Sequence, residues 1–339
     1  MRIAIHHTPN TFSDTWIAYC EKNSIPYKLV NCYDSNIIEQ VSDCDALMWH
    51  HNHASYKDLL FAKQLLYSIE QAGKHVFPNF NTTWHFDDKV GQKYLFEAIG
   101  APLVPSYVFY DKVSAEKWAN STSYPKVFKL RGGAGAANVK LVKSKAEALN
   151  KIRQAFGRGF SPFDRLGLLK ERWRRYKLKE DTLLGVMKGI GRLFIPTEFA
   201  RMRYREKGYV YFQDFIPNND YDTRIVVING EKALGERRFV RENDFRASGS
   251  GSFTYDDINI ETVKLAFNLA QRLKLQSVAF DFIMKDEQPL VVEMSYGYGT
   301  KGIVKAPGYW DSELNWHEGY WDTQEWIIAK LVEDIKRDQ

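Results

Sequence analysis

The sequence predicts an α/β domain with a parallel sheet at the N-terminus, followed by a larger α+β region. Three observations predict this fold class. In the first 80 residues, short apolar strands alternate with segments of helical periodicity. From residue 208 onwards, strand patterns occur in pairs that are separated by turn signals. A chain of 339 residues is also too long for a single domain with one small hydrophobic core, which suggests two or three domains.

The composition is typical of a globular protein, with 44% hydrophobic and 26% charged residues. No apolar run approaches the length of a membrane span, and the start MRIAIHHTPN lacks the pattern of a signal peptide. Cys20, Cys32 and Cys44 form an odd, sparse set without a Cys-x-x-Cys motif, which suits a reducing compartment. We therefore expect a cytoplasmic protein.

The N-terminal α/β domain is expected over residues 1–84. Its expected elements are, in order, the strand RIAIH, a helix from Ser13 or Asp14 to about Asn23, the strands YKLVN and DALMWHH, a helix from Ser55 to about Ala72, and the strand HVFPN. Strands that are separated by helices need right-handed crossovers, so they form a parallel, doubly wound sheet.

Five histidines follow two of these strands: His6 and His7 after the first, and His50, His51 and His53 after DALMW. In open α/β sheets, ligands bind beyond the carboxyl ends of the strands. The histidines therefore either contact a ligand or make capping hydrogen bonds in their loops, and both interpretations stay open. A metal site is the weaker interpretation, because no carboxylate or cysteine shares their spacing.

The middle of the chain begins with a helix expected from about Trp84 to Ile99, which ends at Gly100. The proline-containing segment APLVPSYVFY follows as a connector. YPKVFKL and NVKLV then have the pattern of a hairpin around a glycine-rich loop, and SKAEALNKIRQAF has the pattern of a helix.

The glycine-rich loop places Gly133 and Gly135 at the spacing of a dinucleotide-binding loop. Asn138 replaces the third glycine and a strand follows in place of a helix, which argues against that interpretation. A Walker A loop is excluded because no Gly-Lys-Ser/Thr follows. Lys129 precedes the loop where a lysine could reach a phosphate, and glycines let backbone N–H groups approach one closely. The pattern therefore predicts a hairpin flap over a nucleotide.

Residues 157–200 are less regular, but Leu166, Leu169, Trp173 and Tyr176 have helical spacing. We expect an amphipathic helix with a basic outer face, because KERWRRYKLK contains six Lys or Arg residues. Three interpretations stay open: a solvated face, a lid over an acidic substrate, and a nucleic-acid site. Nucleic acid is the least favoured, because a run of charges on one helix is usually a solvated face.

The last predicted hairpin, AFDFIM followed by PLVVEM, contains a pair of carboxylates. A turn centred on Glu287 places Met284 opposite Leu290, and Asp281 opposite Glu293. Opposed like charges repel, and burying an unpaired carboxylate is costly. A divalent cation such as Mg²⁺ resolves that conflict. The alternative is that one carboxylate faces solvent or pairs with an arginine.

The middle hairpin has an Asn229-Gly230 turn, a strong hairpin signal. With a two-residue turn, Asp222 lies opposite Arg237, and Arg224 shares their face. Further arginines nearby are Arg238, Arg241 and Arg246. This density of arginines exceeds what one ion pair needs and suits a polyanionic ligand.

Taken in order, these motifs resemble those of the ATP-grasp superfamily, and most closely its branch of glutathione synthetase-like and RimK-like carboxylate–amine ligases. The motifs are Lys89, Lys129 with the glycine loop, Gln213–Ile216, Asp222, Arg224, Asp244, Arg246, Asp281 and Glu293–Ser295. Each motif is weak alone, but their order and spacing over residues 85–300 are specific.

The resemblance implies a domain organisation. Residues 1–84 would be the pre-ATP-grasp α/β domain, and residues 85–339 an ATP-grasp fold of two α+β subdomains. The glycine-flap subdomain would cover about 105–212 with the basic helical insertion 157–200, and the catalytic subdomain about 213–339.

The resemblance also implies roles for individual residues. ATP would be bound by Lys89, Lys129, Gly132, Gly133 and Gly135 at its phosphates, by Gln213, Asp214, Phe215 and Ile216 at its adenine, and by Asp222. Mg²⁺, or Mn²⁺, would be held by Asp281, Glu293 and Ser295. Arg224 and Arg246 would stabilise the transferring phosphoryl group, with Arg237 as a third catalytic arginine. Asp214 and Ser295 stand where the family usually has glutamate and asparagine.

The implied activity is ATP-dependent ligation, in which a carboxylate becomes an acyl-phosphate and an amine then forms the amide. A small-molecule kinase with the same ATP site and a non-catalytic ATP-binding module are the alternatives. The expected partners are a small-molecule carboxylate and a small-molecule amine. We expect no nucleic-acid partner and no membrane span. The protein could form a homo-oligomer. Trp310, Trp316 and Trp321 either stack on a saccharide, as in surface-polysaccharide biosynthesis, or pack a C-terminal extension.

Overall fold

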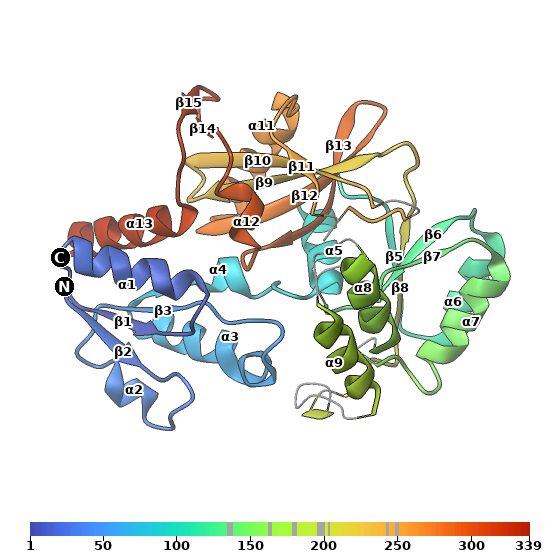
Figure 1. Ribbon diagram of the computed structural model, residues 1–339, viewed down its shortest axis with the longest axis horizontal. Helices are drawn as coiled ribbons and strands as arrows, with labels where there is room; N and C mark the ends of the chain where they lie inside the picture. Colours follow the sequence, from blue (N-terminus) through green and yellow to red (C-terminus); the bar gives the residue numbers. More distant parts are fainter. Residues whose placement is uncertain are drawn as a thin grey trace. The chain divides into compact units, whose positions relative to one another are not determined.

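The structure is a computed structural model that describes residues 1–133, 138–161, 165–177, 182–194, 201–202, 204–241, 244–247 and 251–339. The chain divides into two compact units. Unit 1 comprises residues 1–86, 95–103 and 218–339, and unit 2 comprises residues 87–94 and 104–217. Figure 1 labels the helices and strands of both units.

The N-terminal part of unit 1 is the parallel α/β domain that the sequence predicts. Its elements are β1 (Ile3–His6), α1 (Phe12–Lys22), β2 (Tyr27–Val30), α2 (Ile37–Gln40), β3 (Ala46–Trp49), α3 (Tyr56–Gln71) and β4 (His75–Phe77). All four strands are parallel, in the order β2-β1-β3-β4. The side chains of Thr11 and Ser55 cap α1 and α3 by accepting backbone N–H groups of the first turn. Each of these helices therefore begins at a defined residue after its strand.

The C-terminal part of unit 1 is an antiparallel sheet in the order β13-β12-β9-β10-β14-β15, with β11 paired to β10. Its elements are β9 (Tyr221–Ile228), β10 (Lys232–Phe239), β11 (Phe253–Thr254), α11 (Ile260–Leu273), β12 (Ser277–Lys285), β13 (Gln288–Ser295), α12 (Thr300–Ile303), β14 (Gly308–Asp311), β15 (Trp316–Glu318) and α13 (Thr323–Asp338). Val263 and Phe267 of α11 pack against Ile225 and Phe280 on one face of this sheet. The two predicted hairpins are confirmed as β9 with β10 and β12 with β13.

The opposite face of this sheet shares a core with the N-terminal domain. Val226 and Leu234 of the sheet pack in one cluster with Ile5 of β1, Trp16 of α1 and Ile328 of α13. All five side chains are fully buried. Figure 1 shows α13 beside α1, so the two ends of the chain meet in this core.

Unit 2 is built on a four-stranded antiparallel sheet in the order β5-β8-β6-β7. Its elements are β5 (Ser106–Phe109), α6 (Lys112–Ser121), β6 (Lys126–Lys129), β7 (Lys140–Val142), α7 (Lys145–Ala155), α8 (Arg165–Lys177), α9 (Leu183–Phe194) and β8 (Val210–Asp214). Ala115 of α6 and Ala148 of α7 share a core with Phe128 and Phe212 of the sheet. The predicted flap hairpin is confirmed as β6 and β7, and the expected connector contributes β5.

Of the helix expected over residues 84–99, the structure has α5 (Lys89–Ala98), and the short helix α4 (Phe80–Thr83) ends before the expected start. Asp87 lies between them with a φ of 55°, a left-handed conformation that no helix continues through. The predicted helix start is therefore wrong, while its end is right: Gly100 has a φ of 64°, as helix C-termini favour. Within the described ranges, no helix combines the length and apolar character that crossing a bilayer requires.

The aromatic residues near the C-terminus pack mainly on one another. The ring centroids of Trp310 and Trp316 are 4.6 Å apart. The Tyr309 ring lies 5.1 Å from Trp321 and 5.0 Å from Trp326. These contacts favour the packing interpretation of the segment over sugar stacking, although Trp316 remains 41% exposed.

Candidate active site

The last hairpin pairs Asp281 with Glu293, as predicted, but by a different route. Its turn is one residue shorter than expected, so Met284 lies opposite Pro289 and the expected pairing with Leu290 is wrong. A bulge immediately after Asp281 then shifts the register by one residue. The shorter turn and the bulge offset each other, which brings the two carboxylates opposite one another.

The middle hairpin has a three-residue turn, Asn229–Glu231, where the sequence suggested two residues. Asp222 therefore lies opposite Arg238, and Arg237 lies opposite Thr223. The expected pairing of Asp222 with Arg237 is wrong, because one extra turn residue moves every side chain of β10 to the other face of the sheet.

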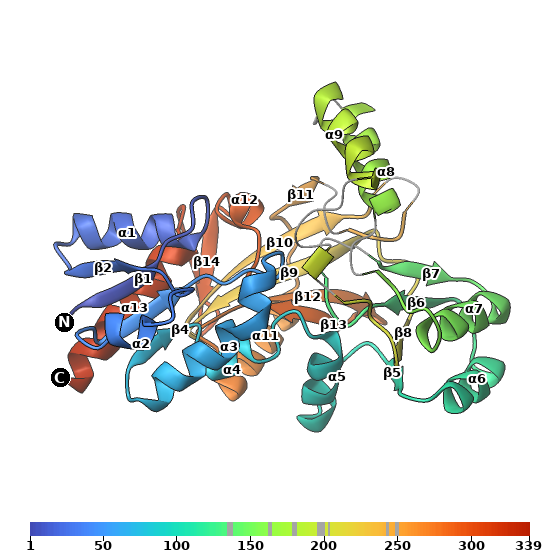
Figure 2. The same cartoon turned by 90° about the horizontal axis from the view of Figure 1, so that it is seen from below.

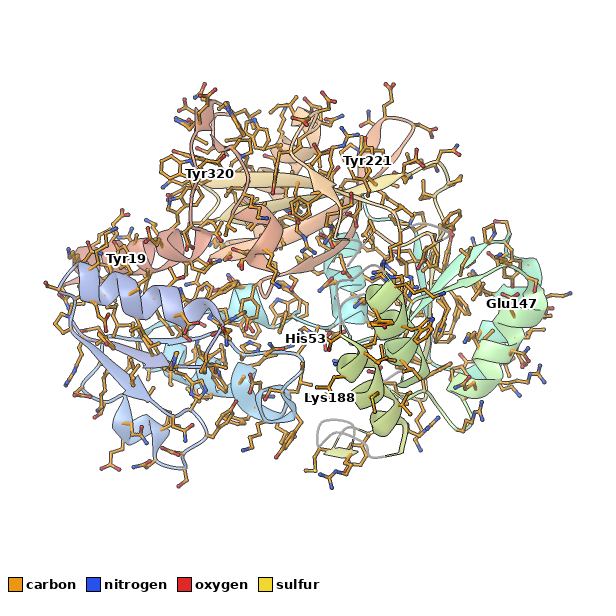
Figure 3. All side chains as sticks on the ribbon, in the orientation of Figure 1. Tyr19, His53, Glu147, Lys188, Tyr221 and Tyr320 are labelled. Atoms are coloured by element: carbon orange, nitrogen blue, oxygen red, sulfur yellow. The ribbon has the colours of Figure 1, made fainter. Side chains whose placement is uncertain are left out.

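Arg237 consequently lies on the face of the sheet opposite to Arg224. Its guanidinium carbon lies 3.7 Å from the centroid of the Tyr221 ring, which is labelled in Figure 3. Its Nη1 also donates a hydrogen bond of 3.2 Å to the backbone carbonyl of Asp256. The structure therefore does not bring Arg237 together with Arg224.

Four charged side chains on the other face of the sheet form what we call the ion cluster. Arg224 donates from Nε and Nη2 to the two oxygens of Asp281 at 2.8 and 2.9 Å. Arg238 donates from Nε and Nη2 to the two oxygens of Asp222, both at 2.7 Å. Nη2 of Arg238 also lies 2.8 Å from Oδ2 of Asp281, which joins the two pairs. Bidentate pairs of this kind are strong and geometrically specific.

The ion cluster keeps Asp281 ionised. Burial alone would raise the pKa of Asp281, but Arg224 and Arg238 outweigh burial and hold this pKa below its usual range. Burial raises the pKa of Asp222, against the opposing effect of Arg238. The structure therefore agrees with the alternative in which one carboxylate of the last hairpin pairs with arginine.

Glu293 and Ser295 are the other residues of the expected metal-binding set. Ser295 lies opposite Ala279, two residues along from the Asp281–Glu293 pair, so the three oxygen-bearing residues share one face. Mg²⁺ prefers oxygen ligands, and this donor chemistry fits it. Both oxygens of Asp281 are engaged by arginines. In the described part of the chain, no group of three His, Cys, Asp or Glu side chains has a metal-binding arrangement.

Glu236 is a site residue that the sequence analysis missed. It lies opposite Arg224 and is 4% exposed. Its Oε2 atom is buried and has no hydrogen-bond partner among the described residues. Burial raises the pKa of Glu236, although Arg224 and Arg238 oppose this effect. The feature that could have identified Glu236 is the length of the turn, because only a three-residue turn puts Glu236 opposite Arg224.

A cavity of about 700 Å³ adjoins these residues, entirely within unit 1. Arg224, Glu236 and Arg238 line it from the sheet, and Phe12 and His50 line it from the N-terminal domain. This volume is typical of sites for small molecules. The cavity therefore offers guanidinium groups, a carboxylate and aromatic rings to a polar ligand.

Three of the histidines at the strand ends make local hydrogen bonds. Nδ1 of His6 accepts from a backbone N–H at 2.9 Å. Nδ1 of His7 lies 3.1 Å from the Ser13 hydroxyl, and Nε2 of His51 lies 2.6 Å from the Thr83 hydroxyl. These bonds agree with the capping interpretation.

His50 differs from the other histidines because it lines the cavity. Its ring stacks on Phe12 with the centroids 3.8 Å apart, and its Nδ1 accepts from the Phe12 N–H at 3.4 Å. Burial, with a smaller effect of His53, lowers the pKa of His50 to about 4. His50 is therefore uncharged at neutral pH.

In unit 2, the first predicted phosphate-binding residues lie together. Nζ of Lys89 donates to the Gly133 carbonyl at 2.7 Å, and the Gly133 N–H donates to Oδ1 of Asp87 at 2.6 Å. Gly133 has a φ of 107°, which favours glycine. Gly132 beside it is buried, whereas Gly135 lies outside the described residues. The described start of the flap is thus tied to the start of α5.

The predicted adenine hinge, Gln213–Ile216, begins in the last two residues of β8 in unit 2. Nζ of Lys129 donates to Oε1 of Gln213 at 2.7 Å, so two predicted ATP-binding residues contact each other. Nζ of Lys126 forms an ion pair with Asp214 at 2.6 Å. Phe215 and Ile216 come next, and both are half-buried. The bonds hold this end of β8 against β6.

Arg246 lies in unit 1, on the segment after β10. Its Nε donates to Oδ1 of Asp244 at 2.9 Å and its Nη2 to Oδ2 at 2.5 Å. Its backbone carbonyl accepts from the N–H of Arg241 at 3.1 Å. The motif Asp244-Phe-Arg246 is therefore held together by its own ion pair, and neither residue belongs to the ion cluster.

Comparison with known proteins places this geometry in a fold family. The family model of the RimK-like ATP-grasp domain matches residues 203–309. Among curated proteins, no sequence is significantly similar to this chain.

Several solved structures share the fold over the whole chain. A RimK domain ATP-grasp protein of Sphaerobacter thermophilus has a TM-score of 0.59 and 14% identity, over 98% of this chain and 99% of that one. A D-alanine–D-alanine ligase of Bacillus anthracis, complexed with ATP, has a TM-score of 0.57 and 14% identity, over 100% and 99%. The macrocyclase MdnC of Microcystis aeruginosa, bound to its precursor peptide MdnA, has a TM-score of 0.57 and 12% identity, over 98% and 100%. The chain therefore has the ATP-grasp fold, and its residues 203–309 match the RimK-like ATP-grasp domain.

Proposed function

We propose that this protein is an ATP- and Mg²⁺-dependent ligase that activates a carboxylate as an acyl-phosphate and joins it to an amine. The observation that carries the proposal is the ion cluster in the wall of the cavity. Arg224 and Arg238 are fixed there by Asp281 and Asp222, so their charges need no reorganisation when a phosphorylated intermediate forms. The relatives by fold include a D-alanine–D-alanine ligase, and this supports the reaction class.

In this proposal, ATP is bound by residues of unit 2. Lys89 and Lys129 bind its phosphates, the glycines of the flap cover them, and the segment Gln213–Ile216 binds the adenine. Asp281, Glu293 and Ser295 hold Mg²⁺, which when bound supplies positive charge that the phosphate oxygens need. Asp222 acts indirectly, because both of its oxygens hold Arg238 in place.

The arginines have the central role in the first step. The substrate carboxylate attacks the γ-phosphorus, the bond from that phosphorus to the leaving ADP breaks, and negative charge accumulates on the transferring oxygens. Arg224 stabilises this charge, and Arg238 keeps Asp281, and through it Arg224, in position.

Glu236 is suited to bind the amine substrate. With Arg224 and Arg238 paired to Asp281 and Asp222, Glu236 brings a further negative charge to this face. A buried carboxylate oxygen without a hydrogen-bond partner is costly, so a donor group of a ligand is favoured there. An ammonium group is such a donor and also balances the charge.

The lining of the cavity supports a proposal for the substrate class. Phe12, Phe253 and Tyr298 contribute rings, and charged and hydroxyl side chains lie between them. Rings suit the apolar faces of a sugar, and polar groups suit its hydroxyls. We propose a saccharide carboxylate or an amino-acid-like acid, which is compatible with a role in surface-polysaccharide biosynthesis.

The test of the reaction is a screen of sugar acids and amino acids with ATP, Mg²⁺ and hydroxylamine. Hydroxylamine traps any acyl-phosphate as a hydroxamate, so the amine substrate need not be known. We expect one carboxylate to give ADP and hydroxamate in equal amounts. ADP with a stable phosphorylated product would identify a kinase, and ATP binding without turnover would identify a non-catalytic module; either result would overturn the proposal.

The substitution Asp281→Asn should lower hydroxamate formation by at least about 100-fold, because it removes a charge that the reaction centre needs. Asp257→Asn is the matched control, since the Asp257 side chain is 91% exposed and makes one weak ion pair on the other side of the sheet. Activity of both variants at the wild-type rate would contradict the role of Asp281. Thermal melting of each variant shows whether it is folded.

The role of Glu236 can be tested separately. Glu236→Gln should raise the KM for the amine about tenfold and leave hydroxamate formation with neutral hydroxylamine nearly unchanged. The control is Glu231→Gln, whose side chain is 55% exposed. A variant with unchanged KM for the amine would rule out this role and leave the ligase proposal intact.

A further inference from the structure

Exposed apolar side chains concentrate in the basic insertion of unit 2 and directly after it. Among the described residues, 21 large apolar or aromatic side chains are exposed, and eight of them fall within residues 173–204. They are Trp173, Tyr176, Leu183, Leu184, Met187, Ile190, Met202 and Tyr204. A cluster of exposed apolar side chains is typical of a surface that contacts another protein or a membrane.

Helix α9 has two different faces. Gly189 faces α8, where a Cβ atom would lie 3.1 Å from side-chain atoms of both Arg172 and Leu169. Leu183, Met187 and Ile190 lie three and four residues apart, so they share another face. They are 54%, 61% and 46% exposed. The two helices therefore pack closely through glycine and leave an apolar face of α9 without cover from the described residues.

The same two helices are strongly basic. Together α8 and α9 contain eight Lys or Arg residues and one Glu, a net charge of +7. The whole chain has a net charge of +5, so the rest of the chain is net acidic. In Figure 2, α8 and α9 lie side by side as a helical hairpin, separate from α6 and α7 of the same unit. The surface that we call the helical hairpin is thus both basic and apolar.

We propose that the helical hairpin (α8 and α9) docks the protein on an anionic lipid surface. An interfacial helix buries its apolar face at the boundary between headgroups and acyl chains, while basic residues contact anionic headgroups. Leu183, Met187 and Ile190 provide the first property, and the net charge of the two helices provides the second. Nucleic acid would use the charge but leave the apolar face exposed to water.

Individual side chains of the helical hairpin support docking on a lipid surface. The ring of Trp173 is 49% exposed, and Nζ of Lys177 lies 5.8 Å from its centroid. Tryptophan next to a basic residue is common at membrane interfaces. Lys188, labelled in Figure 3, follows Met187 on α9 and lies to one side of the apolar face, about 100° round the helix from Met187. A lysine there can reach the headgroups while its apolar neighbours insert.

The test is flotation of the full-length protein with vesicles. One set contains phosphatidylcholine alone, and the other contains phosphatidylcholine with 30 mol% phosphatidylglycerol (about one anionic lipid in three). We expect binding to the anionic vesicles, at least tenfold weaker binding to neutral vesicles, and loss of most binding when the salt concentration is raised. Equal binding to both sets, or binding to neither, would overturn the proposal.

Two variants separate the apolar and electrostatic contributions. The triple substitution Leu183→Gln, Met187→Gln and Ile190→Gln should lower binding to anionic vesicles at least tenfold, while the matched triple Leu29→Gln, Leu60→Gln and Val113→Gln should bind as wild type does. All six positions are at least 46% exposed, so neither triple disturbs the core. Lys177→Glu with Lys188→Glu should lower the affinity about fivefold per residue.

A competing partner would give a different pattern. The wild-type protein could bind a single-stranded oligonucleotide more tightly than anionic vesicles, and the apolar triple variant could bind each of the two ligands as tightly as wild type does. The surface would then be a nucleic-acid site. If the apolar triple variant turned a wild-type dimer into a monomer without changing vesicle binding, the face would contact a second copy. Either result would contradict lipid docking.

Discussion

Asp281 and Glu236 are both buried acids near the same two arginines, but their pKa values are shifted in opposite directions. Burial acts on both side chains, yet two arginines donate directly to Asp281 and lower its pKa, whereas the pKa of Glu236 is raised. Asp281 therefore stays a permanent anion, suited to a cation or to fixed arginines. The Glu236 carboxylate would be stabilised by a ligand that donates a hydrogen bond, because its Oε2 lacks a partner in the described structure.

His50 gives a prediction for the dependence of stability on pH. Its pKa is about 4 in the folded protein, below the usual value of 6.5, so the unfolded chain binds a proton that the folded state excludes. The stabilising effect of neutral His50 is complete above pH 6.5 and is lost as the pH falls towards 4. The free energy of unfolding should fall by up to about 3 kcal/mol over this range.

Chemical denaturation at several pH values checks this effect. His50→Gln should show a smaller decrease of the free energy of unfolding between pH 6.5 and 4 than wild type does, because glutamine does not titrate there. Equal decreases in both proteins would show that His50 is not the group responsible.

At the residue scale, the sequence identified the acids of the last hairpin but not Glu236. Asp281 and Glu293 stand out because each interrupts an apolar run. Glu236 lies between Gly235 and Arg237, where a charged residue is unremarkable. Its burial depends on which face of β10 points to the cavity, and only the register decides that.

At the scale of elements, alternating patterns predicted the strands well, but they could not set turn lengths. A period of two residues identifies which side chains share a face of one strand, and says nothing about how two strands align. The middle hairpin has one turn residue more than Asn229-Gly230 suggested, and the last hairpin has one less, with a bulge after it. The correct pairing of Asp281 with Glu293 therefore rested on two deviations that cancel.

The three-residue turn predicts that Gly230→Ala is destabilising. Gly230 has a φ of 68°, and a Cβ atom there would lie 2.7 Å from Cγ of Gln271. Gly73→Ala is the matched control, because Gly73 has a φ of 81° but open space around it. We expect backbone strain to lower the free energy of unfolding by about 1 kcal/mol in the control, and we expect a larger decrease for Gly230→Ala. Urea denaturation measures both, and equal losses would contradict the contact with Gln271.

At the scale of the whole molecule, unit 1 joins segments from both ends of the sequence. Ile5, near the N-terminus, and Ile328, near the C-terminus, belong to one buried cluster with Val226 of the large sheet. The sequence predicted the N-terminal domain as a separate domain, because its strands and helices are local. That its core continues into the C-terminal sheet could not be predicted, since apolar periodicity shows which face of an element is buried but not its partner.

This shared core predicts that the two parts of unit 1 unfold together. Ile328→Ala should lower the free energy of unfolding by about 2–4 kcal/mol, because Ile328 is fully buried and its truncation leaves a cavity. Hydrogen exchange should then accelerate in β1 of the N-terminal domain as well as in α13. Acceleration confined to α13 would contradict a shared core.

The central claim, activation of a carboxylate as an acyl-phosphate, is tested most directly by oxygen transfer. The carboxylate found in the hydroxylamine screen is labelled with ¹⁸O and incubated with the protein, ATP, Mg²⁺ and an amine. The amine attacks the carbonyl carbon and the bond from that carbon to the phosphate oxygen breaks, so we predict one ¹⁸O atom in each inorganic phosphate released. Unlabelled phosphate, or label retained in a stable phosphorylated product, would contradict the claim.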